Sequence, residues 1–233
     1  MVVKQRGPTC GIYALLNGLK EYYSIENFTN SKIHKLSYQL LSENQYEFNE
    51  STTSGLTYIG EFFYLDKYMA FINENKKIIS NFLYKECNLN VNFEVTKITF
   101  ADILKTDSAL FIVSILPLEE EEEKMKNDNY ISHWVSFIST HNKAEFRILD
   151  SRKGVSSLID FQMLKEAHCK LKNNWFYWDK FERKKLFCFR KIEKLINKNL
   201  KLKKHYLDKG LLINEIKHSV GEVIMIQDAS IQH

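Results

Sequence analysis

The first third of the chain places its apolar residues at the spacing of α-helices. From Cys10 onward these residues step by three and four, which predicts a helix that begins at Cys10. Ser31 can cap a second helix, and a longer helical segment follows the polar loop at 49–55 and runs to about Asn75. The chain therefore opens as a series of helices.

The hydrophobic period then changes from 3.6 to 2, which indicates strands. Val91, Phe93 and Val95 alternate with polar residues, and 109–116 is a continuous apolar run typical of a buried strand. Further strands are predicted at 130–139, 145–150, 186–189 and 222–227, and further helices at 158–171 and 191–204. Helices first and sheet second is the order of an α+β fold.

Composition narrows the class of protein. The 233 residues are 44% hydrophobic and 13% aromatic, which is enough for a substantial core, and eight Gly and two Pro exclude collagen-like and linker-rich chains. The sequence has neither an apolar run of about 18 residues nor a signal-peptide pattern, so we expect a cytoplasmic protein without a membrane partner. The cysteines at 10, 87, 169 and 188 lack the spacing of metal ligands, and we expect no metal.

Charge divides the chain near residue 160. Residues 161–233 hold 16 Lys or Arg against 8 Asp or Glu, whereas residues 1–160 hold 17 against 21. We therefore expect a main domain at 1–160 and a basic C-terminal extension at 161–233 that packs on it. The extension combines lysines with aromatic residues, as nucleic-acid surfaces do, but it has few arginines and no known motif. We expect no nucleic-acid partner.

Cys10 has the surroundings of a reactive thiol. The first turn of a helix stabilises a thiolate with unpaired N–H groups and with the positive end of the helix dipole. The backbone N–H of Cys10 and the side-chain amide of Gln5 could together hold the oxygen of a tetrahedral intermediate. Gly7 and Gly11 would let a substrate backbone come close. The alternative is a small buried cysteine without chemistry.

His133 is the candidate partner base. It begins the apolar run His133–Phe137, where a polar ring is conspicuous, and the next predicted strand ends at Asp150. An antiparallel pair can return Asp150 beside His133, where a carboxylate would fix the tautomer and orientation of the ring. The alternatives are a hydrogen-bonded core histidine and an aspartate that only begins a turn.

These residues resemble a known family. Gln-x4-Cys-Gly at the start of a first helix, His-Trp-Val at 133–135 and Leu-Asp-Ser at 149–151 resemble the papain-like cysteine peptidases, and most of all their C39-like branch. Gly-Pro-Thr-Cys-Gly at 7–11 also resembles the actin maturation peptidases. The resemblance covers residues 1–155 and implies helices packed on an antiparallel sheet, with a cleft between them. It implies these roles: nucleophile Cys10, base His133, orienting acid Asp150 and oxyanion donor Gln5.

We therefore expect a cysteine peptidase that cleaves a peptide or protein substrate through a thioester and needs no cofactor. Gly7, Gly11 and Trp134 are the expected substrate contacts. The same thioester could be opened by an amine or formed from a glutamine side chain, which leaves an acyltransferase, a transglutaminase-like enzyme or a deamidase open. An inactive peptide-binding module of the same fold is the alternative from another class.

Overall fold

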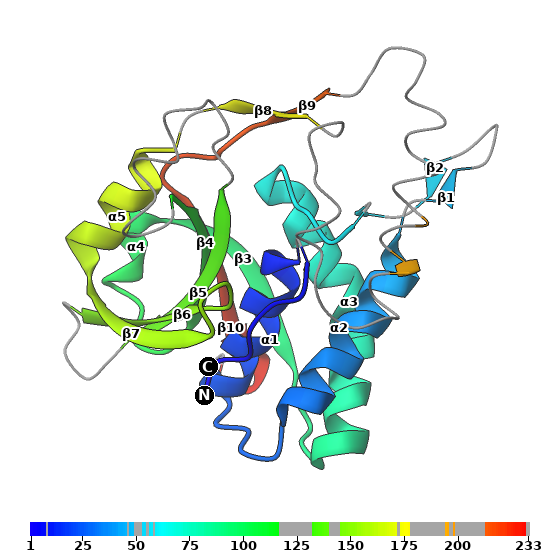
Figure 1. Cartoon of the computed structure of the whole chain (residues 1–233). Coiled ribbons are helices and arrows are strands. Elements are labelled where there is room, and N and C mark those ends of the chain that lie inside the picture. The colour runs from blue at the N-terminus through cyan, green and yellow to red at the C-terminus, as the bar shows by residue number, and fades with distance from the viewer. Residues whose placement is uncertain are drawn as a thin grey trace.

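The computed structural model describes residues 1–7, 9–45, 47–48, 53–54, 56–57, 59–116, 132–139, 145–171, 173–177, 194–195, 198 and 213–231. Within them the fold is α+β, as the order of the elements predicts: N-terminal helices pack against an open antiparallel sheet built from the later part of the chain (Figure 1). None of the described helices has the length and apolar character needed to cross a membrane.

The helices on the N-terminal side are α1 (Cys10–Tyr22), α2 (Asn30–Asn44) and α3 (Leu65–Cys87). The predicted start of α1 at Cys10 is confirmed. The predicted cap of α2 is wrong, because the side chain of Thr29, not Ser31, accepts the hydrogen bond from the Lys32 N–H.

Helix α3 continues well past the predicted end at Asn75. The Asn75 side chain is buried, and it exchanges two hydrogen bonds with Asn44 of α2, with Nδ2 to Oδ1 distances of 2.8 and 3.0 Å. Each amide satisfies the other, so a polar residue can lie inside the helical core. The apolar face resumes at Ile79 and Phe82, and it carries the helix to Cys87.

The main sheet has the strand order β3-β10-β4-β5-β6-β7, and every neighbouring pair is antiparallel. Its strands are β3 (Phe93–Thr99), β4 (Leu110–Ile115), β5 (His133–Ser139), β6 (Glu145–Asp150), β7 (Val155–Asp160) and β10 (Glu222–Asp228). Strand β10 comes from the segment expected to be a basic extension, yet it lies between β3 and β4. That segment therefore supplies an inner strand of the sheet.

The predicted helix at 158–171 is partly wrong. Its first residues belong to the edge strand β7, and helix α5 (Phe161–Cys169) begins only after Asp160, whose carboxylate accepts the N–H groups of Gln162 and Met163. The remaining elements are α4 (Phe100–Ile103), a 3₁₀ turn at Ala229–Ile231, and the pairs β1 (Glu47–Phe48) with β2 (Thr53–Ser54) and β8 (Asn174–Tyr177) with β9 (Ile213–Ile216). The strand predicted at 186–189 and most of the helix predicted at 191–204 lie outside the described residues.

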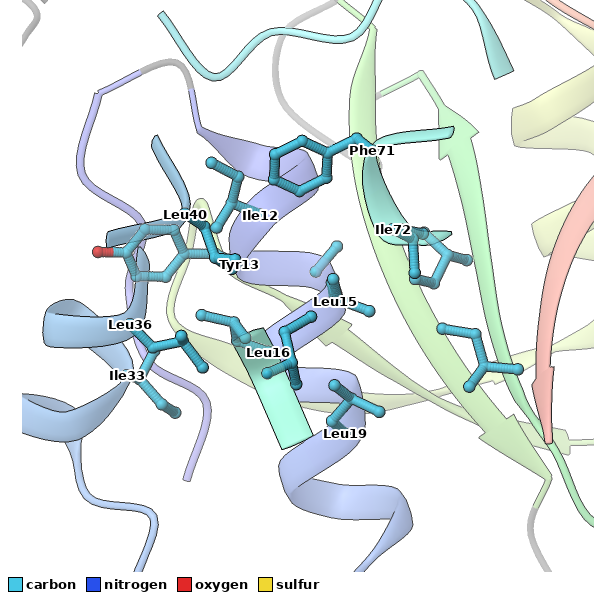
Figure 2. Packing of buried hydrophobic residues seen from close by; sticks show 14 of the residues in the cluster. Ile12, Tyr13, Leu15, Leu16, Leu19, Ile33, Leu36, Leu40, Phe71 and Ile72 are labelled. Atoms are coloured by element: carbon cyan, nitrogen blue, oxygen red, sulfur yellow. The ribbon is translucent and has the colours of Figure 1, made fainter. Parts of the chain in front are cut away.

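Helices cover both faces of the sheet (Figure 1): α1, α2 and α3 lie on one side, and α4 and α5 on the other. Figure 2 shows how apolar side chains of α1 meet those of its neighbours; the labelled ones are Ile12, Tyr13, Leu15, Leu16, Leu19, Ile33, Leu36, Leu40, Phe71 and Ile72.

A glycine lets α1 approach the sheet closely. A Cβ atom added at Gly18 would lie 2.6 Å from Cδ1 of Leu110 on β4 and 3.1 Å from Cβ of Ser136 on β5. Since α1 begins at Cys10 and β5 begins at His133, this packing brings the thiol and the imidazole to the same end of the interface between helix and sheet.

Candidate active site

Cys10 is the first residue of α1, and the residue is half-buried. The preceding Thr9 does not cap the helix with its side chain; its Oγ1 donates to the carbonyl oxygen of Arg6 at 2.7 Å. Residues 10–13, the first turn of α1, include no acidic side chain. The N–H groups and positive dipole end of this turn are therefore left to the thiol.

His133 and Asp150 meet where the β5–β6 ladder ends. The paired residues of that ladder run from Ser139 opposite Phe146 to Ser136 opposite Leu149. Beyond the last pair, Nε2 of His133 donates to Oδ1 of Asp150 at 2.8 Å. The same carboxylate oxygen accepts the backbone N–H groups of Arg152 at 2.8 Å and Lys153 at 3.2 Å, so the turn after β6 holds Asp150 in place.

The Cys10 thiol lies within hydrogen-bonding range of the His133 ring, and each group shifts the pKa of the other. Because Nε2 of His133 is bound to Asp150, Nδ1 is the ring nitrogen left for the sulfur. The thiol of Cys10, the imidazole of His133 and the carboxylate of Asp150 therefore lie next to one another in that order.

Electrostatics favour charge separation in this group. Burial acts to raise the pKa of the Cys10 thiol, but the hydrogen bond and charge of His133 and the N–H groups of Trp134 and Gly11 outweigh it, and the pKa is lowered. Burial acts to lower the pKa of His133, but its bonds to Asp150 and Cys10 prevail and raise the pKa to about 9. These two shifts favour a thiolate and an imidazolium over a neutral thiol and a neutral imidazole.

The carboxylate completes this charge pattern. Burial acts to raise the pKa of Asp150, but the hydrogen bond and positive charge of His133 and the N–H groups of Lys153 and Arg152 hold it below its ordinary value. A charged Asp150 therefore faces the protonated ring of His133, which is itself almost fully buried.

Gln5 is fixed by hydrogen bonds at both ends of its amide. Oε1 accepts from Oγ of Ser151 at 3.0 Å, and Nε2 donates to the carbonyl oxygen of Gly7 at 2.9 Å. An amide nitrogen carries two hydrogens, so Nε2 keeps one beyond the bond to Gly7. Gly7 has a φ of +73°, which a residue with a side chain rarely adopts. The sequence analysis did not assign Ser151 to the site. The one feature of the sequence that could have indicated its role is its position directly after Asp150.

Gly11 and Trp134 are buried beside the thiol. A Cβ atom at Gly11 would lie 2.5 Å from Cδ2 of Phe62, so the ring of Phe62 covers this glycine. The Trp134 side chain is 5% exposed, and its Nε1 donates to the carbonyl oxygen of Phe62 at 3.1 Å. The structure therefore gives both residues packing positions beside the thiol.

Residues 59–63 pack next to the start of α1. The sequence analysis did not assign this segment to the site. Oε2 of Glu61 accepts the N–H of Ile59 at 2.7 Å and the hydroxyl of Thr57 at 3.0 Å, and the N–H of Gly60 donates to Oγ1 of Thr57 at 2.8 Å. A Cβ atom at Gly60 would lie 2.5 Å from Cγ2 of Thr9. This segment is therefore seated directly on the residue before Cys10.

Within the described part of the chain, no group of three or more His, Cys, Asp or Glu side chains is arranged to hold a metal ion. No protein-family model matches the chain, and no curated protein matches it.

Proposed function

We propose that the protein is a cysteine peptidase of the papain-like kind, closest to the C39-like branch, with Cys10 as its nucleophile. The observation that carries the proposal is the continuous contact from Cys10 to His133 to Asp150. A thiol at a helix N-terminus, bonded to an imidazole that a carboxylate orients, is the arrangement that acyl transfer through a thioester requires. The fold gives further support, because the nucleophile lies on a helix and the base on the adjoining antiparallel sheet.

The reaction proceeds in two stages. The Cys10 thiolate attacks the carbonyl carbon of the scissile peptide bond, and the Cys10 N–H with Nε2 of Gln5 stabilises the oxygen that becomes negative. The imidazolium of His133 gives its proton to the departing amine, and an acyl thioester on Cys10 remains. His133 then takes a proton from water, the hydroxide opens the thioester, and the carboxylic acid product leaves with the thiolate and imidazolium restored. No cofactor takes part.

The test is the rate of alkylation of each cysteine by iodoacetamide as a function of pH, mapped by mass spectrometry. Because the thiolate is the species that reacts, we expect Cys10 to be alkylated rapidly well below pH 7. His133→Ala should abolish this advantage. Cys169 is an internal reference because it is exposed, whereas burial raises the pKa of Cys87. If Cys10 reacts no faster than Cys169, or is indifferent to His133→Ala, the proposal fails and an inactive binding module takes its place.

Activity on a peptide library completes the test. Turnover should vanish in Cys10→Ala, and undiminished turnover there would overturn the role of the thiol. The mass of the product distinguishes hydrolysis from the other outcomes of a thioester: addition of water indicates a peptidase, addition of a supplied amine indicates an acyltransferase, and conversion of a glutamine side chain indicates a deamidase or a transglutaminase-like enzyme.

A further inference from the structure

Tyr68 of α3 is a fully buried side chain that contacts both halves of the site. Its hydroxyl donates to the carbonyl oxygen of Gly11 at 2.5 Å. Its ring stacks on Phe62, with centroids 4.4 Å apart, and meets Trp134 edge-on, with centroids 4.8 Å apart. One side chain therefore joins the start of α1 to the start of β5.

The two residues that Tyr68 contacts follow the reacting pair in the sequence. Gly11 comes directly after Cys10, and Trp134 comes directly after His133. The backbone N–H groups of both residues act on the Cys10 side chain as donors and help to lower its pKa. Their positions decide how well the negative sulfur is stabilised, because a charge-assisted hydrogen bond depends on its geometry.

We propose that Tyr68 is a positioning residue that aims the N–H groups of Gly11 and Trp134 at the Cys10 sulfur. This inference rests on the proposed function, since it assigns Tyr68 a part in maintaining the reactive thiolate. Gly11 has no side chain to anchor its peptide groups, so the bond from Tyr68 to its carbonyl oxygen restricts the first turn of α1 from outside the helix.

The packing around Tyr68 leaves it little freedom to move. Phe62 is held from three directions: by the Tyr68 ring, by the Trp134 Nε1–H bond to its carbonyl oxygen, and by the close approach of Gly11. Burial, and then the negative charge of Cys10, keep the pKa of Tyr68 well above its ordinary value. The phenol therefore remains a neutral donor to Gly11 over the acidic and neutral pH range.

Tyr68→Phe tests the inference because it removes the hydroxyl and keeps the stacked ring. Tyr13→Phe is the matched control: Tyr13 is also fully buried, but its hydroxyl bonds to Nδ1 of His34 at 2.6 Å and accepts from Ser37 at 3.1 Å, toward α2. The measurement is the midpoint of Cys10 alkylation by iodoacetamide against pH, together with the melting temperature of each variant.

We expect Tyr68→Phe to raise the alkylation midpoint of Cys10 by roughly 0.5–1 pH unit, which slows alkylation about three- to tenfold at pH values below the midpoint. Tyr13→Phe should lower the melting temperature to a similar degree and leave the midpoint unchanged. Peptide turnover at acidic pH should fall in parallel with alkylation. A purely structural role for Tyr68 would lower the melting temperature alone.

Three results would overturn the inference while leaving the proposed function intact: an unmoved midpoint in Tyr68→Phe, a midpoint that moves equally in Tyr13→Phe, or a midpoint that moves downward. If Tyr68→Phe does not unfold cooperatively, Phe62→Leu decides the matter, because it loosens the stacked ring and leaves the hydroxyl. It should move the midpoint in the same direction, and no shift would overturn the inference. Absence of any enhanced reactivity of Cys10 in the wild-type protein would instead refute the proposed function.

Discussion

Ser151 and Gln5 exchange two hydrogen bonds where the N-terminal segment meets the end of β6. The Gln5 N–H donates to the carbonyl oxygen of Ser151 at 2.7 Å, and Oγ of Ser151 donates to Oε1 of Gln5 at 3.0 Å. Because the hydroxyl fixes Oε1, Nε2 must face the opposite side of the amide. Since Ser151 follows Asp150, one turn of the chain orients both the imidazole and the amide proposed to hold the oxyanion.

Ser151→Ala is therefore predicted to reduce turnover without weakening substrate binding. The Gln5 amide loses the partner that sets its orientation, so stabilisation of the oxyanion should fall by about 1–1.5 kcal/mol, or roughly tenfold in kcat, while KM changes little. Steady-state kinetics on a peptide substrate measure both constants. Ser156→Ala is the control, because Ser156 is exposed on β7. A loss confined to KM, or an equal loss in the control, would contradict the assignment.

The plot of kcat/KM against pH should be bell-shaped. The active form needs a deprotonated Cys10 and a protonated His133, so activity rises with pH through the lowered pKa of Cys10. It falls again as pH passes through the pKa of His133, at about 9. Rates measured from pH 4 to 10 test this. A profile that only rises, with a midpoint near the ordinary thiol value of about 8.5, would show that no ion pair forms.

Asp150→Asn is predicted to narrow the pH range of activity at its alkaline end. The bond to Asp150 helps to raise the pKa of His133, so its loss moves the alkaline limb downward and removes the imidazolium at a lower pH. We expect kcat to fall by about tenfold to a hundredfold. The measurement is the pH profile of the variant against that of the wild type.

Asp160→Asn gives a closely matched control. Asp160 accepts the N–H groups two and three residues ahead of it, as Asp150 does, but it caps α5 and is not bonded to His133. Its replacement should affect stability and leave the alkaline limb in place. An equal displacement in both variants would mean that Asp150 acts through the local turn alone.

Local patterns predict much of this fold. The start of α1 at Cys10 follows from residues that contact one another within a helix, and the strands that begin at His133 and end at Asp150 follow from short apolar runs. These elements placed Cys10, His133 and Asp150 at the ends of helix and strands, where side chains can converge. The proximity of His133 to Asp150 then depended on the antiparallel pairing of β5 with β6, which a short connection favours.

Features that depend on distant residues could not be predicted. The sequence does not predict the end of α3, because the polar run around Asn75 suggests a loop. In the structure, Asn75 can be buried because its side chain bonds to Asn44 on another helix. Strand β7 was read as helix because Leu158 and Phe161 are spaced by three, although Leu158 is exposed at the sheet edge and Phe161 begins α5. The contact of Gln5 with Ser151 joins residues that are 146 positions apart in the sequence.

Gly18→Ala tests whether the close packing of α1 on the sheet maintains the site. In an exposed helix this change would stabilise by about 1 kcal/mol, because alanine has the higher helix propensity. Here the new methyl group meets Leu110 and Ser136, and overpacking of this kind costs about 1–3 kcal/mol, so we expect a net loss of about 1–2 kcal/mol in the free energy of unfolding.

Chemical denaturation measures that loss, and Ser42→Ala, at an exposed position of α2, should stay within about 0.5 kcal/mol of the wild type. Displacing α1 from β5 also separates Cys10 from His133, so the alkylation of Cys10 below pH 7 should slow in Gly18→Ala and not in Ser42→Ala. A Gly18→Ala protein that is more stable than the wild type, with unchanged Cys10 reactivity, would show that the helix reaches its position without this contact.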